Sequence, residues 1–216
     1  MEARNMAGFL RSYANMGKQI PTDIVGPAVG KVTARWHRQI GKVAEWVAAY
    51  GRTSDLLVVG HPTGSDSLTA EALEAALFDS GRPVLIPGSR PPSLETVAIA
   101  WKSTREAARA VSAALPFLIR AKQVVIISAA ESGSIDRNGT ERLTTTLRRH
   151  HPAVEPIFLE SPSSHIGEEL LTKAQQIGAG LLVMGAYSRP RMRELVFGGA
   201  TERVLGGAEV PVLMAH

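Results

Sequence analysis

The residues whose types and spacing could do chemistry lie in the stretch MGAYSRPRMRELVFGGATERVLGG, residues 184–207. It follows an apolar run that predicts a buried strand, and Gly185 and Gly198 would let backbone amides approach a ligand closely. A helix that starts after such a strand stabilises a phosphate at its N-terminus. Ser188 and Gly199, however, stand where a phosphate-binding loop would have a glycine and a hydroxyl. The stretch is therefore either a nucleotide phosphate loop or a turn whose glycines serve packing.

No catalytic constellation can be assembled from the rest of the chain. The serines lack the G-x-S-x-G context of a nucleophile elbow, and no paired carboxylates stand out for acid–base work. The absence of cysteine excludes disulfides, thiolate metal sites and cysteine nucleophiles. His150 and His151 are typical of a helix end, where cations suit the dipole, and have no metal-ligand spacing. The sequence thus predicts no enzyme and no metal site.

Composition narrows the class of protein. The chain has 216 residues, of which 44% are hydrophobic and 20% charged, as in a globular protein with a substantial core. The net charge of +4 is small, and its densest cluster, Arg189, Arg191 and Arg193, is typical of a solvated surface. Aromatic residues, at 5%, are too scarce for base stacking, which argues against nucleic acid. Without a signal peptide or an apolar run of membrane-spanning length, the sequence predicts a soluble, cytoplasmic protein.

Short apolar runs alternate with helical patterns from about Thr33 onward. The runs are continuous rather than alternating, as in strands covered on both faces: 55–60, 82–87, 95–101, 123–128, 155–160, 180–185 and 210–215. Strands separated by helical segments favour a mainly parallel sheet flanked by helices. We therefore expect an α/β fold, with a further helical pattern at 6–16 and a further strand within 32–40.

The segments after the strands carry helix signals. STRE at 103–106 predicts a capping box, in which the Ser103 hydroxyl accepts from the Glu106 amide while the Glu106 side chain reaches back. Pro116 lies inside the apolar pattern that follows and should kink or shorten that helix. Ser164 is expected to cap a later helix, and Gly178 to end it.

An internal repeat organises the chain. AEWVAAYGRTSDLLVVG at 44–60 aligns without a gap with ELLTKAQQIGAGLLVMG at 169–185, and each copy continues to a proline-containing last strand, RPVLIP or VPVLMA. We expect two α/β units, 1–89 and 90–216, joined by the Pro- and Ser-rich PGSRPPSLE. The first unit lacks its opening strand, helix and second strand. It is therefore an N-terminally incomplete unit, or another chain or element covers the gap.

These segments resemble the universal stress protein family, specifically its tandem two-domain members. The resemblance is carried by VAIAWKSTREAARAV at the start of the second unit and by LLVMGAYSRPRMRELVFGGATERVLGGAEVPVLMAH at its end. It implies a five-stranded parallel sheet flanked by helices in the complete unit. It also implies that the last strand pairs across a twofold or pseudo-twofold interface. We therefore expect RPVLIP and VPVLMA to mediate self-association or pairing within the chain.

Family members that bind ATP have the pattern G-x2-G-x9-G-(S/T) after the fourth strand. Gly185 and Gly198 match its first and third glycines, whereas Ser188 replaces the second glycine and Gly199 the hydroxyl residue. The resemblance also implies an aspartate beside the nucleoside, where this sequence has Lys102, whose side chain can only donate. These three departures weaken the expected site.

The resemblance places backbone around Ala100, Trp101 and Lys102, and the second strand near Val125, beside the base and ribose. It predicts a non-enzymatic stress-response or regulatory protein that binds ATP or another adenine nucleotide in the second unit through a degenerate phosphate loop. Two alternatives stay open: a ligand-free protein-interaction module and a weak ATP hydrolase.

Overall fold

The computed structural model describes residues 37–62, 66–129, 135–159, 166–186, 204 and 208–216. In these ranges the helices are α2 (Val43–Gly51), α3 (Ser67–Phe78), α4 (Arg105–Leu118), α5 (Arg137–Leu147) and α6 (Ile166–Gln176). The strands are β1 (Leu57–Val58), β2 (Val84–Ile86), β3 (Thr96–Trp101), β4 (Gln123–Ala129), β5 (Val154–Leu159), β6 (Leu181–Gly185) and β7 (Val212–Ala215). No helix in these ranges combines the length and apolarity needed to cross a bilayer.

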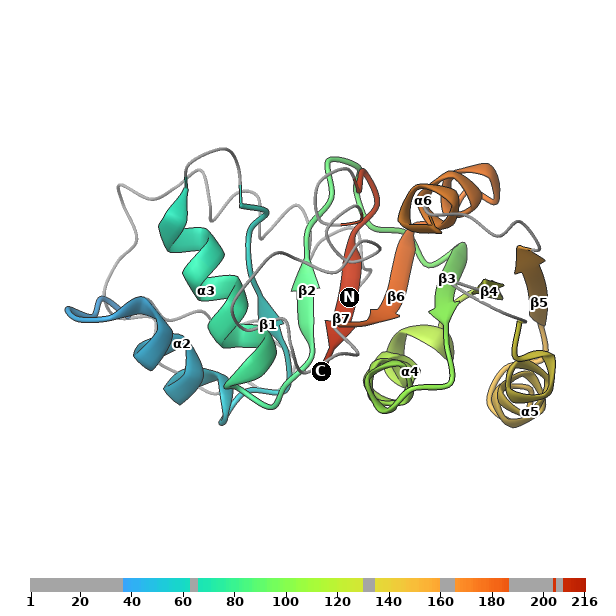
Figure 1. Cartoon of the computed structure of the whole chain (residues 1–216), viewed down its shortest axis with the longest axis horizontal. Coiled ribbons are helices and arrows are strands. Elements are labelled where there is room, and N and C mark those ends of the chain that lie inside the picture. The colour runs from blue at the N-terminus through green and yellow to red at the C-terminus, as the bar shows by residue number, and fades with distance from the viewer. Residues whose placement is uncertain (1–36, 63–65, 130–134, 160–165, 187–203, 205–207) are drawn as a thin grey trace, which may run out of the picture.

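The strands form one sheet in the order β1-β2-β7-β6-β3-β4-β5 (Figure 1). Neighbouring strands are parallel, except that β2 and β7 pair antiparallel. Figure 1 shows α6 on one side of the sheet and α4 and α5 on the other. The predicted α/β fold with a mostly parallel sheet is confirmed, and each of the seven predicted runs contains a strand.

Two apolar clusters cover the two faces of the sheet. On one face, alternate residues such as Ala98 and Leu182 join Ala174 of α6 and the apolar side of α3. On the other face, Ile99 and Val183 join the small residues of α4. Because side chains alternate between the faces of a strand, a strand buried on both sides must be apolar at every position. This burial explains the continuous apolar runs.

The edge strand β1 is shorter than predicted and contributes less to the core. The run at 55–60 yields only Leu57 and Val58, of which Val58 is 40% exposed. The expected strand at 32–40 is wrong for residues 37–40, which form no strand. Residues 32–36, the helical pattern at 6–16 and the expected cap Ser164 lie outside the described residues.

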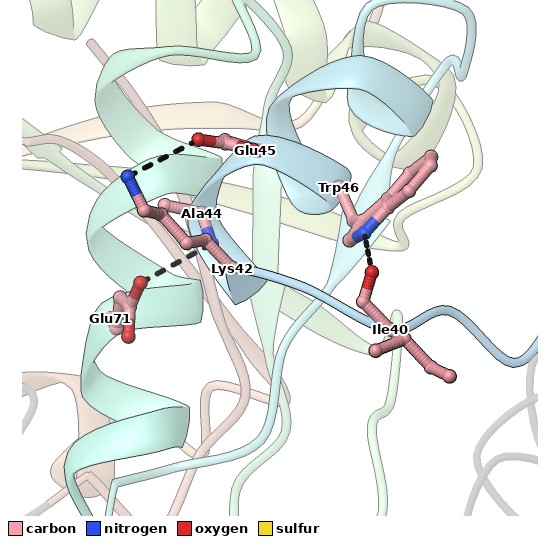
Figure 2. A network of polar contacts seen from close by, with 6 residues as sticks. All are labelled: Ile40, Lys42, Ala44, Glu45, Trp46 and Glu71. Carbon is pink, nitrogen blue, oxygen red and sulfur yellow. Dashed lines mark hydrogen bonds and ion pairs between the residues drawn. The ribbon is translucent and has the colours of Figure 1, made fainter.

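The chain enters α2 through a set of local contacts (Figure 2). The indole Nε1 of Trp46 donates to the carbonyl of Ile40 at 3.2 Å, and Lys42 pairs with Glu45 at 3.5 Å. The amide of Ala44 donates to the Glu71 carboxylate of α3 at 3.5 Å, so these contacts fix the entry of the chain against the α2–α3 pair.

The predicted capping box at the start of α4 is wrong. Thr104 has extended backbone angles and is the N-cap residue, and its hydroxyl accepts from the Ala107 amide at 3.3 Å. The helix begins one residue later than the capping box requires, so Glu106 cannot reach back to a capping Ser103. The Ser103 hydroxyl donates instead to the carboxylate of Asp136.

Pro116 and Gly178 lie near the C-terminal ends of α4 and α6. The helix α4 includes Pro116 and ends just after it, at Leu118, so the proline does not end the helix ahead of itself. Gly178 has a φ of 65° and ends the helical segment of α6 as predicted. Its amide bonds the carbonyl of Gln175, and the next amide bonds Ala174, which completes a Schellman motif.

Candidate functional site

The carboxyl ends of four parallel strands meet at one edge of the sheet. Trp101 of β3 pairs with Ser128 of β4, Ala100 pairs with Met184 of β6, and Gly185 pairs with Ala215 of β7. We call this region the carboxyl edge: the ends of β3, β4, β6 and β7 with the starts of α4 and α5. In open α/β sheets, ligands bind outside the carboxyl ends of the strands.

The structure brings part of the predicted site together at this edge. Ala100 and Trp101 end β3, Lys102 follows them on the surface, and Gly185 ends the neighbouring strand β6. Val125 does not lie there: it is buried in the middle of β4, in the cluster with Ala98. Ser188, Gly198 and Gly199 lie outside the described residues.

Gly185 has a packing role that is independent of any ligand. A Cβ at this position would lie 2.6 Å from the Ala107 nitrogen and 2.8 Å from the carbonyl carbon of Glu106. The first turn of α4 therefore packs directly on the backbone of β6, and only glycine leaves room for it. This contact also places the N-terminus of α4 at the carboxyl edge.

A carboxylate already occupies the start of α4. Glu106 in the first turn is buried, and burial would raise its pKa. Hydrogen bonds from its own amide and from the Thr104 hydroxyl, together with the charges of Arg105 and His216, nevertheless hold the pKa of Glu106 below its ordinary value. The positive end of the α4 dipole is thus compensated from within the protein.

The carboxylate of Asp136 likewise compensates the positive end of the α5 dipole. Its carboxylate accepts from the Ser103 hydroxyl and, at 2.8 Å, from the Gly139 amide. These two hydrogen bonds lower the pKa of Asp136. A Cβ at Gly139 would collide with the Asp136 carboxyl and the Ser103 hydroxyl, so the glycine leaves room for these two side chains to meet. The interaction ties the β3–α4 loop to the start of α5.

Sequence reasoning missed this Ser103–Asp136 interaction. A signal for half of it was present, because Asp136 directly precedes a helical segment and aspartate is a preferred N-cap residue. Its partner Ser103 is 33 positions away in the chain. Only the parallel pairing of β3 and β4, which aligns their carboxyl ends, brings the two side chains together.

Trp101 and His151 both have buried ring nitrogens. The indole Nε1 of Trp101 is buried and has no hydrogen-bond acceptor among the described residues. His151 follows the end of α5, as predicted, but its side chain is only 9% exposed rather than on the surface. Its Nε2 lies 2.8 Å from the carbonyl oxygen of Ala121, which stands in the connection between α4 and β4.

The chemistry available at the carboxyl edge suits binding. Asp136 and Glu106 both have lowered pKa values, so both are ionised at neutral pH and are weak proton acceptors. An ionised carboxylate is a strong hydrogen-bond acceptor with about four lone-pair sites, and Asp136 uses two of them in the contacts above. A neutral hydroxyl of a ligand is a suitable donor to the remainder.

The model of the universal stress protein family matches residues 54–216. A universal stress protein from Archaeoglobus fulgidus DSM 4304 is similar, with a TM-score of 0.61, 19% identity and coverage of 80% of this chain and 64% of that chain. A candidate universal stress protein from Pseudomonas aeruginosa UCBPP-PA14 has a TM-score of 0.54 and 18% identity over 97% and 77% of the two chains.

A third similar structure is that of the universal stress protein from Archaeoglobus fulgidus in complex with dAMP. It has a TM-score of 0.41 and 18% identity over 56% of this chain and 95% of that chain. No curated protein sequence matches the chain. At these identities, the first two likenesses show a shared fold.

Proposed function

Because the chain belongs to the universal stress protein family, we propose that it is a non-enzymatic stress-response protein that binds an adenine nucleotide at its carboxyl edge. The observation that carries the proposal is the meeting of Ala100–Lys102, Gly185 and the Ser103–Asp136 interaction at one edge of the sheet. The nucleotide class follows the family, in which an Archaeoglobus fulgidus member was solved in complex with dAMP. The protein acts in the cytoplasm, which its lack of cysteine supports.

Asp136 takes the part of ribose acceptor in this proposal. Lys102, which stands where the family resemblance places an aspartate, can only donate hydrogen bonds. Asp136 starts the neighbouring helix, and its bond to Ser103 holds its carboxylate beside the end of β3. An acceptor from the β4–α5 connection would thus replace one from the β3–α4 connection.

The nucleoside, rather than the phosphate chain, supplies most of the affinity in this proposal. The carboxylates of Glu106 and Asp136 compensate the positive ends of α4 and α5, so a phosphate gains little attraction there. Ser188 and Gly199 remove two further phosphate contacts that the family pattern would provide. AMP and ATP should therefore bind with similar affinity.

We also propose that the chain is of the tandem type, with units 1–89 and 90–216. The support lies in equal pairing registers. Leu57 pairs with Val84 as Leu182 pairs with Val212, and the sequence repeat aligns Leu57 with Leu182. The antiparallel pairing of β2 with β7 then relates the two strand pairs by an approximate twofold axis.

Calorimetric titration of the full chain with AMP and with ATP tests the nucleotide proposal. We expect both to bind with dissociation constants within about threefold, which corresponds to less than about 1 kcal/mol between them. Asp136→Asn should weaken both, because an amide is a poorer acceptor than a carboxylate. Asp66→Asn is the matched control, since Asp66 caps α3 in the same way, away from the carboxyl edge.

Two other outcomes would favour the alternatives. The absence of binding heat with both nucleotides would favour a ligand-free interaction module. Phosphate release from ATP at a rate proportional to protein concentration would favour a hydrolase and would contradict the non-enzymatic proposal.

A further inference from the structure

One face of the β1–β2 pair is apolar and uncovered in the described part of the chain. Leu56, Val58 and Leu85 lie on this face, which we call the open face. The alternate residues Leu57, Val84 and Ile86 point the other way, into the cluster that contains the apolar side of α3. The helices α2 and α3 thus cover one side of these strands only.

The equivalent face of the β6–β7 pair is covered by the helix α4. The sequence repeat and the equal pairing registers match Val58 with Val183 and Leu85 with Leu213. Val183 and Leu213 are both 0% exposed, in one cluster with Ala110 and Ala114 of α4. Val58 is 40% exposed and Leu85 is partly exposed. A helix in the position of α4 accounts for the difference.

We infer that the N-terminal segment of this chain, within residues 1–36, supplies that helix and packs its apolar side on the open face. In the second half of the chain, α4 precedes α6 and β6 in sequence. A helix within residues 1–36 would precede α2 and β1 in the same order. The covering element would therefore stand at the same place in both halves.

The sequence of this segment fits the position. Apolar residues recur at helical spacing and share one side of a helix: Met6, Phe9, Leu10, Tyr13, Met16 and Ile20. Arg4, Arg11 and Lys18 recur every seven residues on the opposite side. One side is therefore suited to an apolar sheet face and the other to water.

The chain can also reach the open face. At its entry into α2 the Trp46 indole contacts the carbonyl of Ile40, so the segment leaves the described part of the chain next to α2 (Figure 2). The stretch 21–36 between the apolar pattern and the described residues spans up to about 50 Å when extended. This length is enough to pass around the edge of the sheet.

Thiol labelling tests the inference, because the chain has no cysteine of its own. In full-length Val58→Cys, we expect a maleimide reagent to react at least tenfold more slowly than in Ser67→Cys, whose thiol stands on the exposed start of α3. Adding Leu10→Asp, which places a charge on the apolar side of the segment, should bring the Val58→Cys rate to within twofold of the Ser67→Cys rate. Adding Asn15→Asp, which places the same charge on the polar side, should leave the rate slow.

Several results would overturn the inference. One is a Val58→Cys rate equal to that of Ser67→Cys in the full chain. Another is an equal response to Leu10→Asp and Asn15→Asp. Protection that disappears on hundredfold dilution would assign the cover to a second copy of the chain. Leu56→Cys gives the same readout if circular dichroism shows that Val58→Cys is unfolded. The test uses no nucleotide, so its outcome is independent of the proposed binding function.

Discussion

Leu85 of β2 pairs directly with Leu213 of β7 at the one antiparallel junction of the described sheet. The two leucines occupy matching positions, since Leu85 pairs with Val58 as Leu213 pairs with Val183. Their surroundings differ, because Leu213 is completely buried beneath α4 and Leu85 is partly exposed. This junction joins the β1–β2 pair to the strands that form the carboxyl edge.

Truncating Leu213 should therefore destabilise the fold. We expect Leu213→Ala to lower the free energy of unfolding by about 2–5 kcal/mol, through lost burial and the cavity that remains. Leu68→Ala is the matched control, because Leu68 is 61% exposed on α3, and it should change stability by less than about 0.5 kcal/mol. Urea denaturation measures both. Equal losses in the two variants would contradict the burial of Leu213.

The packing of α4 on β6 predicts a difference between two glycines that the sequence repeat aligns. Gly185→Ala should lower the free energy of unfolding by about 1–3 kcal/mol, because its Cβ would meet the backbone of Ala107. A Cβ at Gly60 meets nothing within 4 Å, so Gly60→Ala should be within about 0.5 kcal/mol of the unchanged protein. Thermal unfolding followed by circular dichroism compares them. Unaltered stability of Gly185→Ala would exclude the close contact.

The Ser103–Asp136 interaction predicts a pH dependence. The pKa of Asp136 is lowered in the folded protein, so its contribution to stability is present above about pH 4 and is lost as the pH falls through the folded-state pKa. Ser103→Ala should raise the pKa of Asp136 towards its ordinary value. NMR titration of the side-chain carboxyl carbon measures the shift, with the carboxyl of Asp66 as the internal reference. An Asp136 pKa that does not respond would show that Ser103 does not hold the carboxylate.

Removing the charge of Glu106 should alter nucleotide preference. In Glu106→Gln the start of α4 is no longer compensated by a carboxylate, so a phosphate gains attraction from the helix dipole. At about 0.3–1 kcal/mol for such an interaction, the affinity for ATP relative to AMP should rise about two- to fivefold. Calorimetry with both nucleotides gives the ratio. A ratio that stays unchanged would mean that the phosphates lie away from α4.

Much of the fold could be predicted because burial on both sheet faces leaves a direct trace in the sequence. The run at 123–128 is apolar at its four central positions, and the structure places it in a strand between two others. The edge strand β1 is weaker, since one neighbour is missing among the described residues, and only two of its residues form a ladder. Its apolar run alone could not distinguish a central strand from an edge strand.

Contacts between distant segments could not be predicted in this way. The N-cap of α4 depends on Thr104, while Ser103 bonds a residue at the start of another helix. The burial of His151 likewise depends on the carbonyl of Ala121, 30 positions earlier. Local patterns state which residue types suit a helix end, but the partner that a side chain finds is decided by the packing of the sheet.

Part of the candidate site could likewise be predicted from the sequence, and part of it could not. The adjacency of Ala100 and Gly185 could be expected, because the carboxyl ends of parallel strands share an edge. Which residue of β4 lies at the carboxyl edge could not be predicted, because this depends on the pairing register. Val125 lies opposite Ala98 inside the core, and Ser128 lies opposite Trp101 near the edge.

The most direct test of the central claim is the position of the nucleotide on the fold. In an amide NMR titration of the full chain with AMP, the account predicts shifts for Lys102, Ser103 and Gly139 at the carboxyl edge. Gly178, at the opposite ends of the strands, should remain unshifted. Shifts centred on Gly178, or no shifts at saturating AMP, would contradict the account.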